Sequence, residues 1–492
     1  MGVDPDASQS LIEPGRWPDE ATGRSARDCL TVFAVLWALA TLFHLWVNPR
    51  GLGVVDDPTL LGLSHVAAGV AAISVLLRPR SSGRLLVLAA LGVITCWLEA
   101  PFLGNHWLIA AFVDLALLAS AATCWTRDGL DTARLAARFL PLARWSLLGF
   151  YAFAAFSKLN HAFFEPAVSC GNFYADELAG SLGFGRFRSA DGGGWAVLLP
   201  ISVVAIEASI PVLLVRRRWR HIGVVVGLVF HSAVALDMTH LFSDFSAVLA
   251  ALFVLFLPTS FGTDVLALAR RHPTPTFVLK ALAVAAAAVV LLVEWTARGE
   301  RVFVDGRAWA WIAVDAALLA VVVWYLRQER PAPESGQLRL SGPPWLVVVP
   351  LLVVLNGLTP YVELKTAYGW NMYSNLSTVD GETNHLLVPR TWPVLDAQAE
   401  LVRIVSSSDP GLSLYVTERF DIPFLQLRAY LSGHRDASIT YERAGQRHAL
   451  AHAAEDPDLV RAVPEWQQKL SAFRALDQTE PNRCQPGFLP AH

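Results

Sequence analysis

Residues 151–164 read Tyr151-Ala-Phe-Ala-Ala-Phe-Ser-Lys158-Leu-Asn-His-Ala-Phe-Phe164, an apolar run that contains a single lysine. The run belongs to a longer apolar segment, residues 139–163, which is long enough to cross the hydrocarbon core of a bilayer. A charged amine in hydrocarbon costs roughly 3 kcal/mol even on lenient insertion scales, so such a residue usually lines a cavity and has a function. We therefore expect a helical membrane protein in which Lys158 faces a cavity.

The composition also indicates a membrane protein. Of the 492 residues, 54% are hydrophobic and 16% are charged, whereas soluble domains carry about 25% charged residues. The formal net charge of −3 is too small to favour nucleic acid or an acidic partner. The 5 cysteines include no CxxC pair and no metal-type Cys/His spacing, so we expect no bound metal.

Apolar segments of about 20 residues recur throughout residues 29–361 and predict an all-α polytopic membrane domain with about eleven spans. The expected spans are 29–47, 59–77, 84–103, 106–126, 139–163, 195–215, 221–239, 243–260, 276–296, 308–326 and 343–361. Residues 1–28 are polar and do not resemble a signal peptide, so they are predicted to be a disordered cytoplasmic tail.

The distribution of arginines sets the expected orientation. Arginines concentrate in every second connection, for example residues 78–84 and 216–220. By the positive-inside rule these connections and the N-terminus are cytoplasmic. An odd number of spans then places residues 362–492 outside the cell (plasma) membrane.

Residues 362–492 are predicted to form a small extracytoplasmic α+β domain. Residues 401–405 and 438–441 have the alternating pattern of short strands. Residues 458–476 are interpreted as a mostly polar helix that is interrupted near Pro464.

Two cysteines fall on the expected outer face, Cys170 in the loop 164–194 and Cys484 near the C-terminus. Because that face is oxidising, they could pair and tie the loop to the C-terminal domain. The alternative is two free or partly buried thiols, since the sequence does not give the distance between their Cα atoms.

Polar residues gather at one depth, in the outer half of the expected spans. They are His44, His65, Glu99, Asn105, His106, Lys158, His231, His240 and Asp244. Taken singly, each is explained by snorkelling or by a hydrogen bond to backbone, and we interpret His44, His65, Asp114, Lys280 and Asp315 as structural. Taken together, Lys158, His106 and His231 are better explained by a shared cavity.

The sequence leaves the protonation state of Lys158 open. Aromatic walls such as Phe156 and Phe163 would favour the neutral amine, which is a base. A nearby Glu99 or Glu207 would favour the ammonium instead.

A series of short motifs extends over most of residues 29–445. It comprises Asn105-His106 at the start of a span, Lys158-Leu-Asn160 with Phe163-Phe164 and Pro166-Ala-Val-Ser-Cys170, Phe230-His231 within a later span, and residues 361–376 with Asn384-His385 after the last span. In order and expected topology, these motifs resemble the HTTM family of membrane proteins, whose best-understood members are the vitamin K-dependent γ-glutamyl carboxylases.

The resemblance implies a lyase that oxidises a quinol. Lys158 would deprotonate a reduced vitamin K or menaquinol-type quinone, and oxygen would convert the anion to a stronger base that forms a carbanion on the acceptor for capture of CO₂. His106 would be the second catalytic residue and would stabilise an anion by hydrogen bonding. Asn105, Asn160 and His231 would line the quinone pocket.

Two departures from the carboxylases limit this reading. Carboxylases usually carry a second lysine immediately before the catalytic one, and Ser157 stands there in this chain. Their extracytoplasmic half, which holds the propeptide of the substrate, is also much longer. We therefore expect carbanion chemistry on an unknown small-molecule or peptide acceptor, within membrane lipids and without nucleic acid.

The competing hypothesis is a non-catalytic membrane protein, such as a maturation or immunity partner that binds a lipid or a peptide. Under that hypothesis Lys158 is dispensable. A transporter ranks lower because the ionisable groups favour one side of the bilayer and the sequence shows no paired broken helices.

Overall fold

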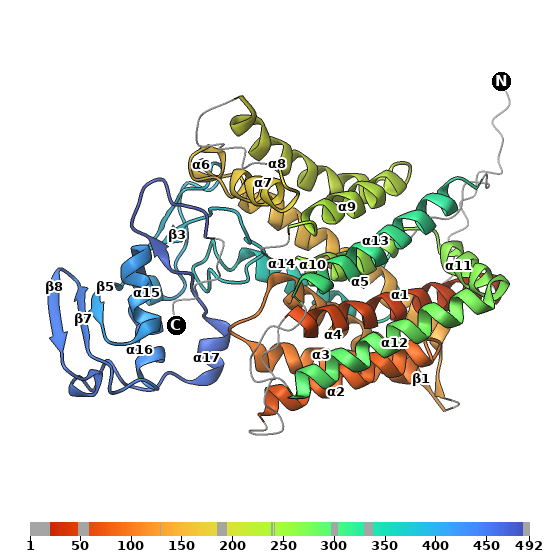
Figure 1. Cartoon of the computed structure of the whole chain (residues 1–492), viewed down its shortest axis with the longest axis horizontal. Helices are drawn as coiled ribbons and strands as arrows, with labels where there is room; N and C mark the ends of the chain where they lie inside the picture. The colour runs from red at the N-terminus through yellow and green to blue at the C-terminus, as the bar shows by residue number, and fades with distance from the viewer. Residues whose placement is uncertain are drawn as a thin grey trace.

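The computed structural model describes residues 20–47, 59–127, 129–184, 194–237, 240, 242–296, 304–328 and 338–485. A helical region and a C-terminal region with a β-sheet lie next to each other (Figure 1). Each region has an apolar core of its own, which in the C-terminal region is formed by residues between Val402 and Ala475.

Seven helices among the described residues are long and apolar enough to cross a membrane. They are α1 (Glu20–Val47), α2 (Leu60–Leu77), α3 (Ser82–Glu99), α4 (Asn105–Cys124), α5 (Thr132–Ser157), α8 (Gly194–Val215) and α13 (Val304–Leu326). A further pair, α11 (Ser260–Arg271) and α12 (Pro273–Thr296), is bent by 103° and would supply an eighth span if the pair counts as one.

The structure thus confirms a helical membrane-type architecture but not the expected count of eleven spans. The segments 221–239, 243–260 and 343–361 fall on shorter helices: α9 (Arg220–Val234), α10 (Ser243–Val254), and the pair η2 (Pro344–Val347) and α14 (Val348–Leu358). At about 1.5 Å of rise per residue, the 12 residues of α10 cover only about 18 Å.

Two expected boundaries also need correction. Helix α1 begins at Glu20, so residues 20–28 of the predicted tail 1–28 are helical. Residues 1–19 lie outside the described residues. The expected span 139–163 ends earlier, at Ser157, because the chain turns at Lys158 and Asn160 caps the short helix α6 (His161–Phe164) through its side chain.

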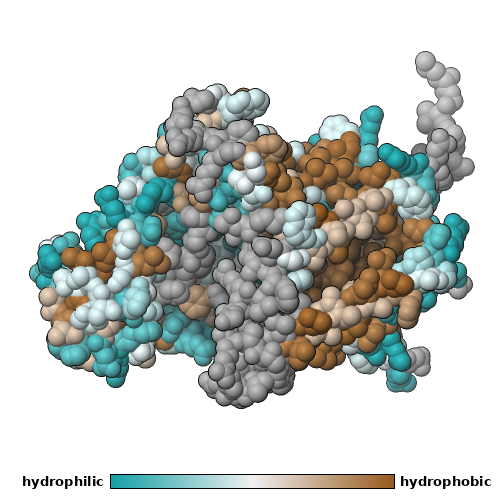
Figure 2. Space-filling view, viewed as in Figure 1, coloured by the Kyte–Doolittle hydropathy of each residue, from teal (hydrophilic) through white to brown (hydrophobic). Residues whose placement is uncertain are grey.

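The surface of the helical region is strongly apolar. Hydrophobic residues gather over the helices in Figure 2, whereas hydrophilic residues predominate over the C-terminal region. Helix α12, for example, exposes Phe277, Leu279 and Leu292. Because apolar patches of this extent are rare on soluble monomers, the surface is suited to contact with lipid.

The C-terminal region contains a five-stranded antiparallel sheet of order β8-β7-β5-β6-β9. Its strands are β5 (Leu401–Ser407), β6 (Phe420–Pro423), β7 (Ile439–Arg443), β8 (Gln446–Leu450) and β9 (Leu476–Asp477), with α15 (Pro410–Glu418) and α16 (Phe424–Leu431) between them in sequence. The two strands expected from the sequence correspond to β5 and β7.

The helix expected over residues 458–476 is wrong. Only α17 (Glu465–Leu470) forms there, and the chain continues into β9. The physical reason is a long-range contact, since the carbonyl of Ala472 accepts hydrogen bonds from the backbone of Thr366 and Ala367. The remaining elements are the hairpins β1 (Trp125–Thr126) with β2 (Gly129–Leu130) and β3 (Thr378–Val379) with β4 (Glu382–Thr383), the helix α7 (Cys170–Ser181), and the 3₁₀ turns η3 (Asp396–Gln398) and η4 (Ala453–Glu455).

Candidate functional site

A cavity of about 210 Å³ lies where helices α5, α7, α8 and α9 meet the loop that follows α14. Aromatic and aliphatic side chains make up most of its wall, including Phe150, Phe163, Phe230, Phe242, Phe245 and Met372. Four acidic or basic side chains also line it: Lys158, Glu207, His231 and Asp237. Tyrosines and the disulfide-bonded Cys170 complete the polar part of the wall. The cavity is therefore apolar with a few polar groups, as is common for small-molecule sites.

Lys158 is the C-cap residue of α5, and its side chain is buried with 4% of the residue exposed. Its Nζ donates to the carbonyls of Ala154, at 3.3 Å, and Met372, at 3.5 Å. The C-terminal end of a helix carries a partial negative charge that stabilises a cation. The expectation that Lys158 faces a cavity agrees with this geometry.

Glu207 is the charged partner of Lys158. Its Oε2 lies 2.8 Å from Lys158 Nζ, and helix α8 supplies it to the cavity wall. The sequence analysis considered both Glu99 and Glu207 as neighbours of the amine. The structure selects Glu207, since Glu99 contacts two histidines elsewhere.

His231 and Tyr151 form the other polar pair in the cavity wall. The Tyr151 hydroxyl makes a short hydrogen bond with His231 Nε2, and the rings of Phe245 and Phe253 lie against the imidazole. The structure thus brings His231 and Lys158 to one cavity, as expected. Tyr151 was missed, although its spacing of seven residues from Lys158 places both on one helix face.

Two tyrosines outside the long helices complete the wall, Tyr174 on α7 and Tyr373 in the loop after α14. Their rings are in edge contact, with centroids 4.6 Å apart. Burial raises the pKa of both hydroxyls, that of Tyr373 to about 12. Both are therefore neutral near pH 7, and they add polarity to the cavity without charge.

The loop after α14 has an unusual backbone. Five of its non-glycine residues have positive φ: Glu363, Tyr368, Trp370, Tyr373 and Asn375. Such conformations cost about 1 to 3 kcal/mol each and persist where surrounding contacts enforce them. The loop also supplies the Met372 carbonyl to Lys158. Its strained conformation therefore shapes one wall of the cavity.

Asparagines hold this loop in place. Asn105 Oδ1 accepts from the Trp370 amide at 3.1 Å, and Asn160 Nδ2 donates to the carbonyls of Ser157 and Ser374. Neither residue lines the cavity. The resemblance implied that both are pocket residues, but the structure shows them as supports of the loop that reaches the pocket.

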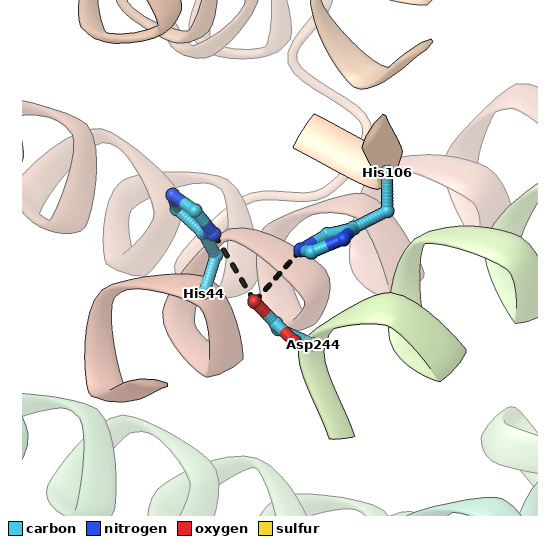
Figure 3. A group of neighbouring side chains, drawn as sticks. All are labelled: His44, His106 and Asp244. Atoms are coloured by element: carbon cyan, nitrogen blue, oxygen red, sulfur yellow. Dashed lines mark hydrogen bonds and ion pairs between the residues drawn. The ribbon is translucent and has the colours of Figure 1, made fainter. Parts of the chain in front are cut away.

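His106 does not line the cavity either. Its Nε2 lies 2.8 Å from Asp244 Oδ2, which is also 3.3 Å from His44 Nδ1 (Figure 3). The ring of Phe245 contacts both His106 and His231, with centroid distances of 5.6 and 4.9 Å. His106 is thus separated from the cavity by one aromatic side chain.

His44 continues this cluster toward a second carboxylate. Its Nε2 lies 3.0 Å from Glu99 Oε1, and His65 Nε2 lies 2.8 Å from the same oxygen. Imidazoles and carboxylates therefore alternate in a buried chain, His65–Glu99–His44–Asp244–His106. We interpreted His44 and His65 singly as structural residues, and that interpretation missed the chain because its members come from five helices.

The other polar residues considered structural make local contacts. Trp37 Nε1 donates to Asp114 at 2.8 Å, Ser232 donates to Asp315, and Lys280 donates to the Leu77 carbonyl at 2.7 Å. His240 lies 2.9 Å from Asp237. These contacts join neighbouring segments, and their chemistry suggests no further site.

Cys170 and Cys484 form a disulfide with a Cα–Cα distance of 4.8 Å. The Asn375 side chain reinforces this junction by accepting from the Cys170 amide and donating to the Val168 carbonyl. Cys170 begins α7 and lines the cavity. The bond therefore ties the end of the C-terminal region to one wall of the cavity.

Comparison of this chain with protein-family models, with curated proteins and with solved structures finds no match.

Proposed function

We propose that this chain is a membrane enzyme that binds a reduced quinone in the cavity and uses Lys158 to deprotonate it. The observation that carries the proposal is a buried lysine, paired with Glu207, in an apolar cavity within a membrane-type helical region. The reaction class is that of the vitamin K-dependent carboxylases, which the motifs around Lys158 and His106 resemble.

The cavity is suited to the ring of a quinol. A cavity of roughly 150 Å³ is known to hold benzene, and this one measures about 210 Å³ with walls of aromatic and aliphatic side chains. The isoprenoid tail of a menaquinol would extend beyond the cavity into lipid. When bound, the reduced quinone supplies the electrons with which oxygen generates a strong base.

Lys158 and Glu207 would take up the hydroxyl proton of the quinol. In the resting pair Lys158 is an ammonium, so its proton would first pass to the Glu207 carboxylate 2.8 Å away. The neutral amine would then accept the hydroxyl proton of the quinol, and the ammonium formed would lie beside the quinolate and the neutral Glu207 carboxyl group. A positioned base of this kind contributes about 10² to 10⁴ in rate. The Tyr151–His231 pair offers a second hydrogen-bonding group on the same cavity.

His106 enters the proposal in a modified role. Because Phe245 lies between His106 and the cavity, direct hydrogen bonding to an anion there requires Phe245 to move. Asn105 and Asn160 act as supports of the loop at Met372. The residues proposed to contact the quinol are Lys158 and His231.

We also propose the orientation that the arginine distribution favours. Arginine-rich connections such as residues 216–220 would face the cytoplasm together with the N-terminus. The C-terminal region would then lie outside the cell membrane, where the Cys170–Cys484 disulfide is chemically favoured.

The test is a reaction of the purified full-length protein with reduced menaquinone, oxygen and labelled CO₂. Quinone epoxide, followed by chromatography, and fixed label on candidate small-molecule and peptide acceptors are the products expected. Lys158→Met should abolish both epoxide formation and label fixation. Lys280→Met is the control and should retain both activities, because the described hydrogen bond of Lys280 goes to the Leu77 carbonyl. If the wild-type protein forms no epoxide and fixes no label, the enzymatic proposal is wrong.

One observation favours a second candidate, a non-catalytic protein that binds a lipid or peptide. The Lys158 amine already has an ion-pair partner, Glu207, and two carbonyl acceptors, as expected for a structural ion pair. In that case a lipid binds in the cavity without reacting, and the Lys158→Met variant retains the cellular phenotype.

A further inference from the structure

We infer that His44, His106 and Asp244 bind a divalent transition-metal ion of the zinc or iron(II) class. His44 Nδ1, His106 Nε2 and a carboxylate oxygen of Asp244 all lie within 4.8 Å of one another. In a four-coordinate site with metal–ligand distances of about 2.1 Å, ligand atoms lie about 3.4 Å apart. The His44 contact with Asp244 Oδ2, at 3.3 Å, is close to that separation, whereas the His106 contact, at 2.8 Å, is a hydrogen-bond distance that would have to lengthen on metal binding.

The three ligands come from helix ends, which gives them fixed positions. His44 lies in the last turn of α1, His106 in the first turn of α4 and Asp244 in the first turn of α10. Both imidazoles point toward Asp244 in Figure 3. Trp107 stacks on the His44 ring, with centroids 3.7 Å apart, and the Phe245 amide donates to Asp244 Oδ1. Oδ2 is thereby directed at the two imidazoles.

The hydrogen-bond inventory of His44 supplies the strongest argument. Its two ring nitrogens face two different carboxylates, Asp244 at Nδ1 and Glu99 at Nε2. A neutral imidazole has one N–H and one lone pair, so the two contacts are both favourable only if a proton or a metal ion lies between Nδ1 and Asp244. A metal ion at the Asp244 end meets this condition, since Nδ1 binds the ion while Nε2–H donates to Glu99.

That arrangement is the usual environment of a metal-bound histidine, which donates its second N–H to a carboxylate. Here Glu99 is that carboxylate, and His65 Nε2 lies 2.8 Å from the same oxygen, Oε1, that His44 contacts. Glu99 and His65 would therefore orient the ligand His44 without touching the ion.

Charge balance points the same way. Glu99 and Asp244 are buried, and their side-chain partners among the described residues are the imidazoles of His44, His65 and His106. One divalent ion neutralises two carboxylates and leaves all three imidazoles uncharged. Without the ion, the charge of the two carboxylates would have to be balanced by protons within the cluster itself.

The ligand set narrows the class of ion. Two imidazoles and one carboxylate suit zinc and non-haem iron(II), and three protein ligands leave coordination positions open. His106 has the most exposed of the three side chains, at 12%, and marks the side from which an ion or a small ligand would enter. We expected no metal from the cysteine and histidine spacing, and such spacing cannot detect ligands from three separate helices.

The experiment measures ion binding directly and needs no quinone, so it is independent of the proposed function. Purified full-length protein in detergent is stripped with a chelator and titrated with Co²⁺ alone and then with Zn²⁺ as competitor. We expect one Co²⁺ per chain with the intense visible bands of four- or five-coordinate cobalt, and displacement by one equivalent of Zn²⁺.

Asp244→Asn and His44→Gln should weaken binding at least 100-fold. Asp114→Asn is the matched control, since Asp114 is a buried carboxylate of α4 that contacts Trp37. Equal binding by Asp244→Asn and Asp114→Asn would overturn the site. If the ligand variants do not fold, the wild-type spectrum decides: weak, octahedral-type bands or binding only at millimolar Co²⁺ would also overturn it.

Discussion

The two polar sites of the helical region are built in different ways. Around Lys158 the polar groups line a cavity of about 210 Å³, and the amine is paired with the one carboxylate of Glu207. Around His44 the polar groups contact one another directly, in the chain from His65 to His106. The ring of Phe245 contacts one histidine of each site, His106 and His231.

This difference indicates different ligands. The first site has room for an organic molecule and offers it one amine, one imidazole and aromatic walls. The second offers imidazole and carboxylate ligand atoms within 4.8 Å of one another, which suit a metal ion. The two sites should therefore respond independently to substitution.

The largest effect is expected from the Lys158–Glu207 pair. Lys158→Met should lower quinol oxidation by about 10² to 10⁴, the usual contribution of a positioned base, while Co²⁺ binding stays unchanged. Glu207→Gln leaves a buried ammonium without its counter-ion and should destabilise the protein by about 3 to 5 kcal/mol. Thermal unfolding and oxygen uptake measure the two effects.

The double variant Lys158→Met/Glu207→Gln separates stability from activity. With both charges removed, unfolding should return close to the wild-type temperature, because no unpaired charge is left. Activity should stay lost. Recovery of quinol oxidation in the double variant would contradict a role of Lys158 as base.

The next largest effect is expected from His65, which contacts Glu99 in the histidine–carboxylate chain. His65→Gln should weaken Co²⁺ binding by about 10- to 100-fold, as is typical when an outer-shell partner is removed. Quinol oxidation should hardly change, because His65 is not part of the cavity wall. Loss of quinol oxidation with unchanged Co²⁺ binding would reverse the assignment of the two sites.

The sequence predicts the depth of a side chain along its helix better than the direction in which that side chain points. Depth along a helix is readable from sequence, and it placed Lys158 and His231 correctly near one cavity. Rotation about the helix axis is not readable in the same way, so His106 was expected in that cavity and instead faces Asp244. Asp244 itself is positioned by the short helices α9 and α10, whose lengths the apolar pattern overestimated.

The C-terminal region shows the same limit. Alternating residues sufficed to predict β5 and β7, because each strand has one face in the core. The segment after Leu470 has a helical composition, but backbone contacts with Thr366 and Ala367 fix it in another conformation. Such contacts between distant segments cannot be read from local pattern.

A smaller effect is expected from the disulfide that reaches the cavity wall. Replacing Cys170 and Cys484 with serine should destabilise the C-terminal attachment by about 2 to 5 kcal/mol. Because Cys170 lines the cavity, quinol binding should weaken while Co²⁺ binding is retained. Limited proteolysis and binding titrations measure both, and equal weakening of the two ligands would show that the sites are coupled.

The smallest effect is expected from Asp477, close to the disulfide. Burial raises the pKa of this carboxyl, but hydrogen bonds from Arg483 and Thr479 outweigh it, so the pKa lies below its usual value. The carboxylate therefore stabilises the fold above about pH 3.9, and its contribution is lost as the pH falls through the folded-state pKa.

Asp477→Asn should accordingly cost about 1 to 2 kcal/mol near pH 7 and make unfolding less dependent on pH below pH 5. Denaturant unfolding at several pH values checks this. A variant whose stability falls with acid as steeply as that of the wild type would show that Asp477 does not carry the effect.

The most direct test of the central claim is the absorption spectrum of menadiol, a reduced naphthoquinone without a tail, bound to the protein in the absence of oxygen. The wild-type protein should bind it with the red-shifted spectrum of the quinolate anion. Lys158→Met should bind it with the spectrum of the neutral quinol. The same neutral spectrum in both proteins, or no binding to either, would contradict deprotonation by Lys158 in this cavity.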